Sequence, residues 1–215
     1  MVIRNVRFGD IDSYKDLGLI LSSREISSPK IKEHYVDVDG ADGSLDLTEV
    51  LGEIRYETRS IKLGFTVVDD RSKFWDIFSN VQNLIHGKRF RIVFDDDEDF
   101  YYVGRVSIDK WKTDKVLGTM NFTIEADPYK YWREETVLIE DVVDTKTIRL
   151  TNMRKSVNPT FLATNSMSLV FGSATVVVPP NEEIYSPDIR LTEGEHWLKV
   201  NGTGTLTIRY QMASL

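Results

Sequence analysis

Carboxylates are the side chains of this chain best placed to do chemistry, and they gather in two stretches. The first, residues 37–49 (DVDGADGSLDLTE), is rich in acids like the calcium loop of an EF-hand. That loop needs glycine at its sixth position and glutamate at its twelfth, whereas counting from Asp37 gives Asp42 and Thr48. The second stretch, residues 95–99, is five adjacent acids, whose mutual repulsion favours a solvated loop. We therefore expect no metal site in either stretch.

Other catalytic chemistry has few candidate residues. The chain has no cysteine, which excludes disulfides, thiolate nucleophiles and cysteine-based metal centres. Its three histidines, His34, His86 and His196, are far apart in the sequence and lack metal-ligand spacing. A glycosidase needs two carboxylates in different environments, which neighbouring acids on one exposed tip do not provide. We expect a protein that is not an enzyme and that binds neither a metal nor another cofactor.

Net charge and hydropathy exclude further classes of function. The formal charge of −7 argues against a protein that grips nucleic acid, because such proteins need a basic face to displace counterions. No apolar run approaches the ~18 residues of a membrane span, so we expect no membrane partner. The first ten residues, MVIRNVRFGD, lack the pattern of a signal peptide. Together with the absence of cysteine, this favours folding in a reducing cytoplasm.

The first half of the chain has clear periodic patterns. Aspartate and glycine at 39–43 predict an exposed turn, and the alternation over 60–68 predicts a strand with one buried face. Apolar residues at helical spacing over 74–85, Leu84 included, predict one amphipathic helix. Asp70 is suited to cap the start of this helix and Gly87 to end it. A hairpin is predicted around the acidic tip at 95–99.

The second half of the chain has only strand-like patterns. Residues 134–146 are acidic and predict a connection between two domains. Short strands separated by Asn, Gly, Pro and Ser follow from 147 to 215, which is typical of a small β-sandwich of jelly-roll type. Its last two strands are expected to form a hairpin at Asn201-Gly202. The sequence thus predicts a mainly β fold, with a β-sandwich-like domain and one α-helix over 1–133.

Several motifs resemble one protein family. The run DGADGSLDLTEVLG followed by IRYETRSIKLGF, the segments FYYVGRVS at 100–107 and ADPYKYW at 126–132, and the ending IRLTEGEHWLKVNGTGTLTIRYQMASL occur in this order. Together they resemble the siphophage distal tail protein (Dit) family. The resemblance spans almost the whole chain, and the family has no catalytic residues to transfer.

The resemblance implies an architecture and an assembly. It implies an N-terminal domain that forms a homo-hexameric ring and a galectin-like C-terminal domain. The ring would be a structural adaptor, or hub, between the tail tube protein and the tail-tip, tail-fibre or baseplate proteins. It would reside in the virion tail after assembly in the cytoplasm of the bacterial host, and phage DNA would pass through it without specific binding.

Two sets of residues are candidate contact sites. Leu45, Leu47 and Leu51 lie beside the exposed turn, where they either contact a neighbouring subunit or fill the first sandwich. The alternative function is a carbohydrate-binding protein that uses its C-terminal sandwich. Tyr185 and Trp197 are the candidate sugar contacts, although Tyr and Trp in such a sandwich are more often core or interface residues.

The acidic stretches generate a first prediction. Because neither has the ligand spacing of a calcium site, EDTA is expected to leave the thermal unfolding of the protein unchanged. Differential scanning fluorimetry with and without the chelator checks this. A melting temperature that falls by several degrees in EDTA would contradict it.

Overall fold

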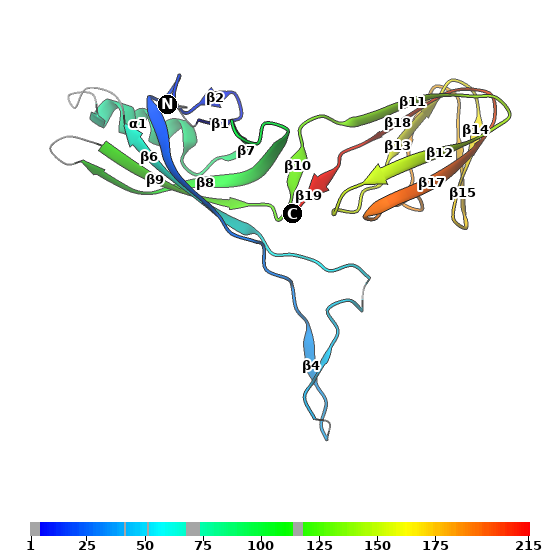
Figure 1. Ribbon diagram of the computed structural model, residues 1–215, viewed down its shortest axis with the longest axis horizontal. Helices are drawn as coiled ribbons and strands as arrows, with labels where there is room; N and C mark the ends of the chain where they lie inside the picture. The colour runs from blue at the N-terminus through cyan, green and yellow to red at the C-terminus, as the bar shows by residue number, and fades with distance from the viewer. Residues whose placement is uncertain (1–4, 41, 51, 68–73, 114–117) are drawn as a thin grey trace. The chain divides into compact units, whose positions relative to one another are not determined.

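The computed structural model describes residues 5–40, 42–50, 52–67, 74–113 and 118–215 (Figure 1). The chain divides into two compact units, residues 1–128 (unit 1) and 129–215 (unit 2). Each unit has its own hydrophobic core. The mainly β fold class predicted from the sequence is confirmed in both.

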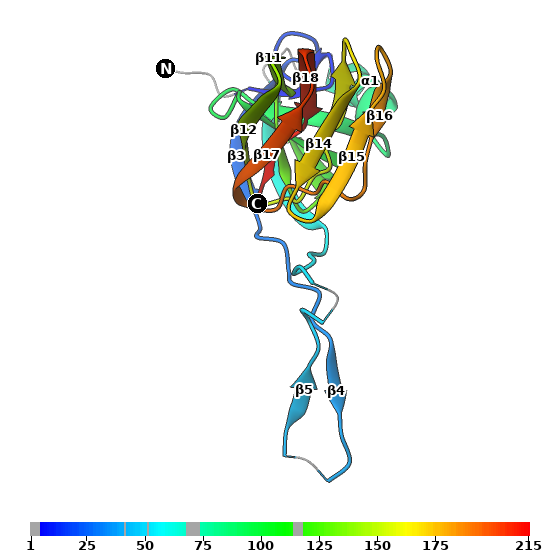
Figure 2. The same cartoon turned by 90° about the vertical axis from the view of Figure 1, so that its right-hand side faces the viewer.

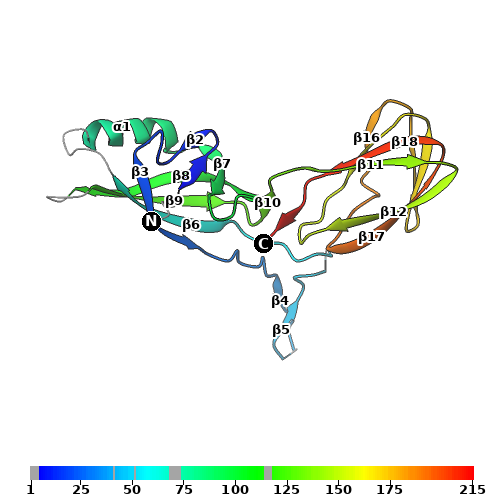
Figure 3. The same cartoon turned by 45° about the horizontal axis from the view of Figure 1, so that its top comes forward.

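Unit 1 is built on an antiparallel sheet with one helix on its face. The strands, in sheet order, are β2 (Ile11–Asp12), β1 (Val6–Phe8), β7 (Arg89–Phe94), β8 (Phe100–Thr113), β9 (Gly118–Ala126), β6 (Arg59–Val67) and β3 (Leu19–Ile26). The predicted hairpin around the acidic tip is the β7–β8 pair. Helix α1 (Phe74–Ile85) lies along one face of the sheet (Figure 3) and buries Phe74, Val81 and Ile85.

The sheet of unit 1 curls around its core. Phe8 of β1 and Phe65 of β6 are not on neighbouring strands, yet their ring centroids are 6.4 Å apart. Phe122 of β9 lies 6.0 Å from Phe8 and 4.8 Å from Phe65. Such contacts between distant strands require the two ends of the sheet to approach one another. The expected β-sandwich-like domain with one helix is confirmed.

Helix α1 has its predicted span, and one residue of its predicted buried stripe is exposed. Gly87 follows it with a φ of +76°, the left-handed conformation expected at a helix end. Leu84, predicted to be part of the buried stripe, is 37% exposed because it lies at the margin of that stripe. The predicted N-cap, Asp70, lies outside the described residues.

Residues 27–58, which we call the arm, connect β3 to β6. The arm contains a two-stranded antiparallel pair, β4 (Tyr35–Asp37) and β5 (Ser44–Asp46) (Figure 2). Gly40 and Gly43 in the intervening turn have φ values of +83° and +77°, which confirms the predicted turn. None of the described arm residues is buried.

Unit 2 is a sandwich of two four-stranded antiparallel sheets. One has the order β11 (Thr136–Val142), β18 (Gly204–Tyr210), β13 (Thr160–Ala163) and β16 (Glu183–Tyr185). The other has the order β12 (Thr145–Asn152), β17 (Gly194–Asn201), β14 (Met167–Phe171) and β15 (Ala174–Val178). Phe161 and Leu198, from the two sheets, are fully buried. Two short strands, β10 (Lys130–Trp132) and β19 (Ala213–Ser214), pair with each other. The predicted small C-terminal sandwich is confirmed.

The predicted terminal hairpin is wrong. Strands β17 and β18 belong to different sheets, so the turn at Asn201–Gly204 crosses from one sheet to the other. The backbone N–H of Gly202 donates to the carbonyl of Asp144, 2.9 Å away, in the turn that joins β11 to β12. A strand that forms a hairpin with the preceding strand and a strand that crosses to the opposite sheet have the same alternation of apolar and polar residues. The sequence pattern therefore does not distinguish the two.

The domain limits also differ from the expected ones. The division falls after Pro128, and most of the expected connection at 134–146 is strand β11, which pairs with β18 along its length. The acids of β11 have polar partners. Glu140 accepts from Lys146 at 2.7 Å and Asp141 accepts from Thr205 at 2.8 Å. An acidic composition is therefore compatible with an edge strand, whose side chains are partly solvated.

The aromatic core of unit 1 can be tested by truncation. Phe122→Ala is expected to lower the free energy of unfolding of unit 1 by about 3–5 kcal/mol, because it removes a ring that is 1% exposed and leaves a cavity. Urea denaturation measures the loss. The control Val50→Ala, at a position 66% exposed, should change it by no more than about 0.5 kcal/mol. A loss below about 1 kcal/mol for Phe122→Ala would contradict this core.

Candidate interaction surfaces

The described residues offer no metal centre. They contain no group of three or more histidine, aspartate or glutamate side chains placed to hold an ion. At the acidic tip Asp96 is paired instead, because its Oδ2 accepts from Nη2 of Arg24 at 2.8 Å. Burial is the main cause that raises the pKa of the neighbouring Asp95. In the described part of the chain no helix is long and apolar enough to span a membrane.

The arm has one apolar face and one polar face. Val36 lies opposite Leu45 in the β4–β5 register, and they are 37% and 55% exposed. Because side chains alternate along a strand, Val38 and Leu47 extend the same face, which we call the ribbon face. The other face carries Tyr35, Asp37, Ser44 and Asp46, which are paired across the two strands.

The three leucines predicted as contacts have different positions. Leu45 is exposed and Leu47 is half-buried, and neither belongs to the core cluster of unit 1. The interpretation that these two fill the first sandwich is therefore wrong, because the arm carries them away from it. Leu51 lies outside the described residues. Val36 and Val38 were not predicted as contact residues, although pairing the two strands about the turn at 39–43 would have placed them beside Leu45.

The distal arm, residues 33–53, holds the net charge of the chain. It has seven acidic residues and no lysine or arginine. Since the whole chain has 34 acids and 27 cations, the remainder has 27 of each (34 − 7 = 27) and is formally neutral. The negative charge is thus a local property of the arm.

An acidic groove of about 420 Å³ lies on the arm, lined by Glu33, Tyr35, Asp46 and Glu49 among others. Asp46, and then Glu33, raise the pKa of Tyr35 above its ordinary value, with a smaller contribution from burial. Hydrogen bonds from the hydroxyl and the backbone N–H of Thr48 lower the pKa of Asp46. The carboxylate of Asp46 therefore remains charged at neutral pH.

An exposed aromatic cluster lies on helix α1 and strand β8. Trp75 is 58% exposed, and its ring centroid is 4.6 Å from that of Trp111 on β8. Trp111 in turn lies 4.8 Å from Phe78. We call these three residues the Trp75 patch. No pattern in the sequence singles out this patch, because Trp75 lies beside the predicted buried stripe rather than in it.

The two candidate sugar contacts do not form one site. Tyr185 is 63% exposed and Trp197 is 60% exposed, so neither is a core residue, and of the expected core or interface positions only an interface remains. Tyr185 is on β16 and Trp197 is on β17, which belong to different sheets of the sandwich. The outer faces of these two sheets point in opposite directions. Trp197 instead lies opposite Arg149, whose Nη1 is 3.5 Å from Oε1 of Glu195.

Comparison with known proteins identifies the fold. No family model matches the chain, and no curated protein sequence does either. The crystal structure of the SPP1 Dit protein aligns with a TM-score of 0.69 over 98% of this chain and 100% of its own, at 16% sequence identity. The chain has the Dit fold.

The Dit fold covers both units, because the alignment leaves out almost none of either chain. This confirms the architecture implied by the motifs in the sequence. SPP1 Dit is described as a paradigm of the hub of the adsorption apparatus in phages that infect Gram-positive bacteria. At this identity the likeness establishes the fold and no residue-level role.

The electrostatics of the arm generate a prediction. Asp46→Asn should lower the pKa of Tyr35, because it removes the group that raises this pKa most. Titration of the Tyr35 ring signals by NMR measures the change. The matched control Asp39→Asn removes the same charge from a residue that does not contribute to the shift. Equal effects of the two substitutions would mean that the β4–β5 pair is not formed in solution.

Proposed function

We propose that this protein is a structural component of a siphophage tail, a hexameric hub between the tail tube protein and the tail-tip, tail-fibre or baseplate proteins. The observation that carries the proposal is the Dit fold along the whole chain. The resemblance of the sequence motifs to the same family supports it independently. The protein acts by assembly rather than by catalysis, and it resides in the virion tail after assembly in the host cytoplasm.

The arm is the proposed contact between subunits. Its two strands share three residue pairs, and a two-stranded ribbon of this size is marginally stable in water. Its ribbon face is apolar and exposed, so docking on a neighbour would both remove it from water and order it. Leu45, Leu47 and Leu51 are the proposed contact residues, joined by Val36 and Val38.

A ring follows from a head-to-tail contact. If the arm of each copy docks on a different surface of the next, the contact is heterologous, and such contacts close when the rotation between copies allows. In the proposed ring the N-terminal units line a channel and the C-terminal sandwiches stand outside it. Six copies carry a formal charge of −42 (6 × −7), held by their distal arms, and arms that face the channel would repel DNA and let it pass without binding.

A second candidate function is carbohydrate binding by unit 2. The observation that favours it is Trp197, an exposed aromatic side chain beside the Arg149–Glu195 pair. Sugar sites combine an aromatic platform with polar groups of this kind. Tyr185 would belong to a separate site on the opposite sheet. A glycan array probed with the wild-type protein and with Trp197→Ala tests this candidate.

Assembly tests the proposed hub. Multi-angle light scattering of the wild type at high protein concentration should give a species of about 148 kDa (6 × 24.7 kDa), with rings in negative-stain images. Leu45→Ser should shift the mass toward the monomer, since it places a hydroxyl on the ribbon face. Val177→Ser is the control, because Val177 is similarly exposed, at 62%, on unit 2.

Two outcomes would count against this account. A wild-type protein that stays monomeric, alone and with a tail tube or tail-tip protein, would refute the hub. A monomer that assembles only on such a partner would retain the adaptor role and refute self-assembly.

A further inference from the structure

We infer that strand β15 of unit 2 is a docking site for an extended segment of another protein, which adds to its sheet as a fifth strand. The inference goes beyond the proposed hub and does not depend on it. It concerns the free edge of β15 (Ala174–Val178), which pairs with β14 and with no other strand in the described part of the chain. Figure 2 shows β15 at the end of its sheet, beyond β14.

The first argument is a row of unpaired backbone groups along this edge. A two-residue loop joins β14 to β15, and its first residue, Gly172, has a φ of +58°, as in a type II′ turn. Phe171 and Ala174 flank this loop and pair with each other, and in such a turn they are hydrogen-bonded. Because hydrogen-bonded pairs alternate along an antiparallel ladder, the N–H and C=O groups of Thr175 and Val177 point away from β14. No hydrogen bond from a turn or loop of the described chain reaches these groups.

The second argument is that β15 lacks the features that protect free edges. Folded proteins blunt such edges with charged side chains, bulges, prolines or very short strands. The other three edge strands of the sandwich, β11, β12 and β16, each carry at least one charged residue. Strand β15 has the uncharged sequence ATVVV and no register shift in its pairing, and proline follows only after its last residue. Its edge is therefore open to another strand.

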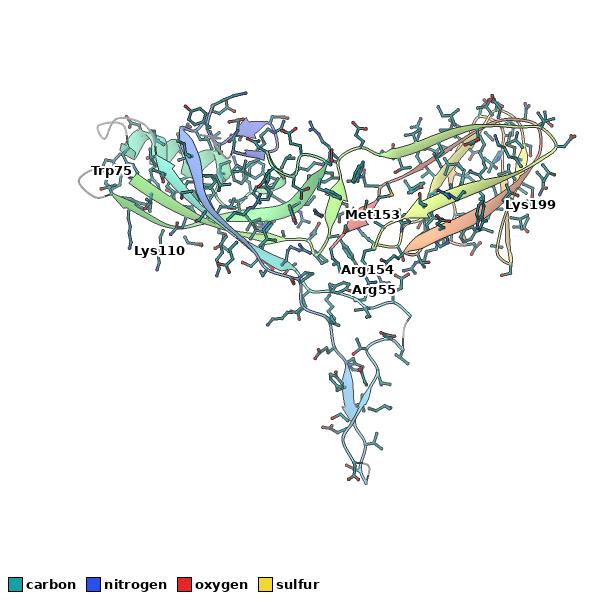
Figure 4. All side chains as sticks on the ribbon, in the orientation of Figure 1. Arg55, Trp75, Lys110, Met153, Arg154 and Lys199 are labelled. Atoms are coloured by element: carbon teal, nitrogen blue, oxygen red, sulfur yellow. The ribbon has the colours of Figure 1, made fainter. Side chains whose placement is uncertain are left out.

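The third argument is the chemistry around the edge, which defines the partner. Thr175 and Val177 are exposed on the outer face of the sheet, and Val176 is half-buried at the margin of the core. The row that contains Thr175 continues through Val170 to Lys199 on β17, which is labelled in Figure 4. The cation on this row is thus separated from the edge by a whole strand. An incoming strand meets uncharged, β-branched neighbours, and cross-strand pairs with such residues stabilise a sheet.

The occupant is an extended segment of a partner protein. N–H and C=O groups that repeat at every second residue of a strand are matched by the backbone of another strand, as in peptides that add to a sheet edge. The segment is uncharged where it meets β15, and its inward side chains are apolar because they cover Val176. A second copy of β15 would have to bring two whole sandwiches edge to edge, whereas a single segment contacts only the edge.

The first test uses a synthetic peptide of sequence KTVTVTK, which has the stated chemistry at its centre and lysines at its ends for solubility. Added to the full-length protein, it should slow hydrogen exchange of the Thr175 and Val177 amides at least about tenfold, because a hydrogen-bonded amide exchanges only when it opens. The amides of Ala174 and Val176 face β14 and should change less. A control peptide with proline in place of both valines cannot pair and should have no effect.

The second test changes the edge. Val177→Pro removes one outward N–H and no hydrogen bond to β14, so it should abolish binding of the labelled peptide, measured by fluorescence anisotropy, while the sandwich stays folded. Its matched control, Val177→Thr, keeps the N–H and should bind like the wild type. Thr175→Lys places a protective charge on the edge and should weaken binding at least about tenfold. This variant tests the site even if Val177→Pro does not fold, which circular dichroism checks.

The outcomes decide between a docking edge and an inert one. Protection of Thr175 and Val177 by the peptide, lost on edge substitution, supports the site. No binding at millimolar peptide, or binding that both Val177→Pro and Thr175→Lys leave unchanged, would overturn it. Self-association of the wild type without peptide, abolished by Val177→Pro, would make a second copy the occupant and would also overturn it. The proposed hub is judged by the mass of the wild type and its arm variants, so the two proposals fail independently.

Discussion

The arm exposes apolar and acidic side chains that the described part of its own chain does not cover. It exposes an apolar face at Val36, Val38 and Leu45, and its distal part holds seven acids with no cation to balance them. A short two-stranded ribbon gains little stability from its own hydrogen bonds. Contact with another surface that is apolar and basic would remove the exposed face from water and pair the acids with cations. The proposed assembly follows from this constraint.

The rest of unit 1 gives the arm a fixed origin. The arm leaves the sheet at β3 and returns at β6, and these two strands pair with each other from Leu19↔Val67 to Ile26↔Ile61. Phe8, Phe65 and Phe122 hold the curled sheet around one core. The same core anchors helix α1 and, through Phe74, the Trp75 patch. One unit therefore presents both the arm and the Trp75 patch.

The sequence was informative where the determining interactions are local. The helix at 74–85, the turn at 39–43 and the strand at β6 each follow from periodicity or turn residues within a few positions. Predictions failed where distant contacts decide the outcome. Whether the strand after Asn201 returns to the same sheet depends on β11 and β13, which are far away in sequence. The exposure of Tyr185 and Trp197 depends on which face of each strand meets the opposite sheet. The Trp75 patch needs the approach of α1 to β8, which no local pattern encodes.

Cross-linking between copies through the arm tests the proposed assembly most directly. The chain has no cysteine, so Val38→Cys would carry a maleimide-linked benzophenone at one defined position on the arm, and irradiation would join it to the surface that it contacts. The account predicts a ladder of cross-linked oligomers on a denaturing gel, ending at a closed hexamer, whereas the same label at Val177→Cys, an exposed position on unit 2, leaves the protein monomeric on that gel. A protein labelled on the arm that assembles into rings but stays monomeric on that gel would contradict it.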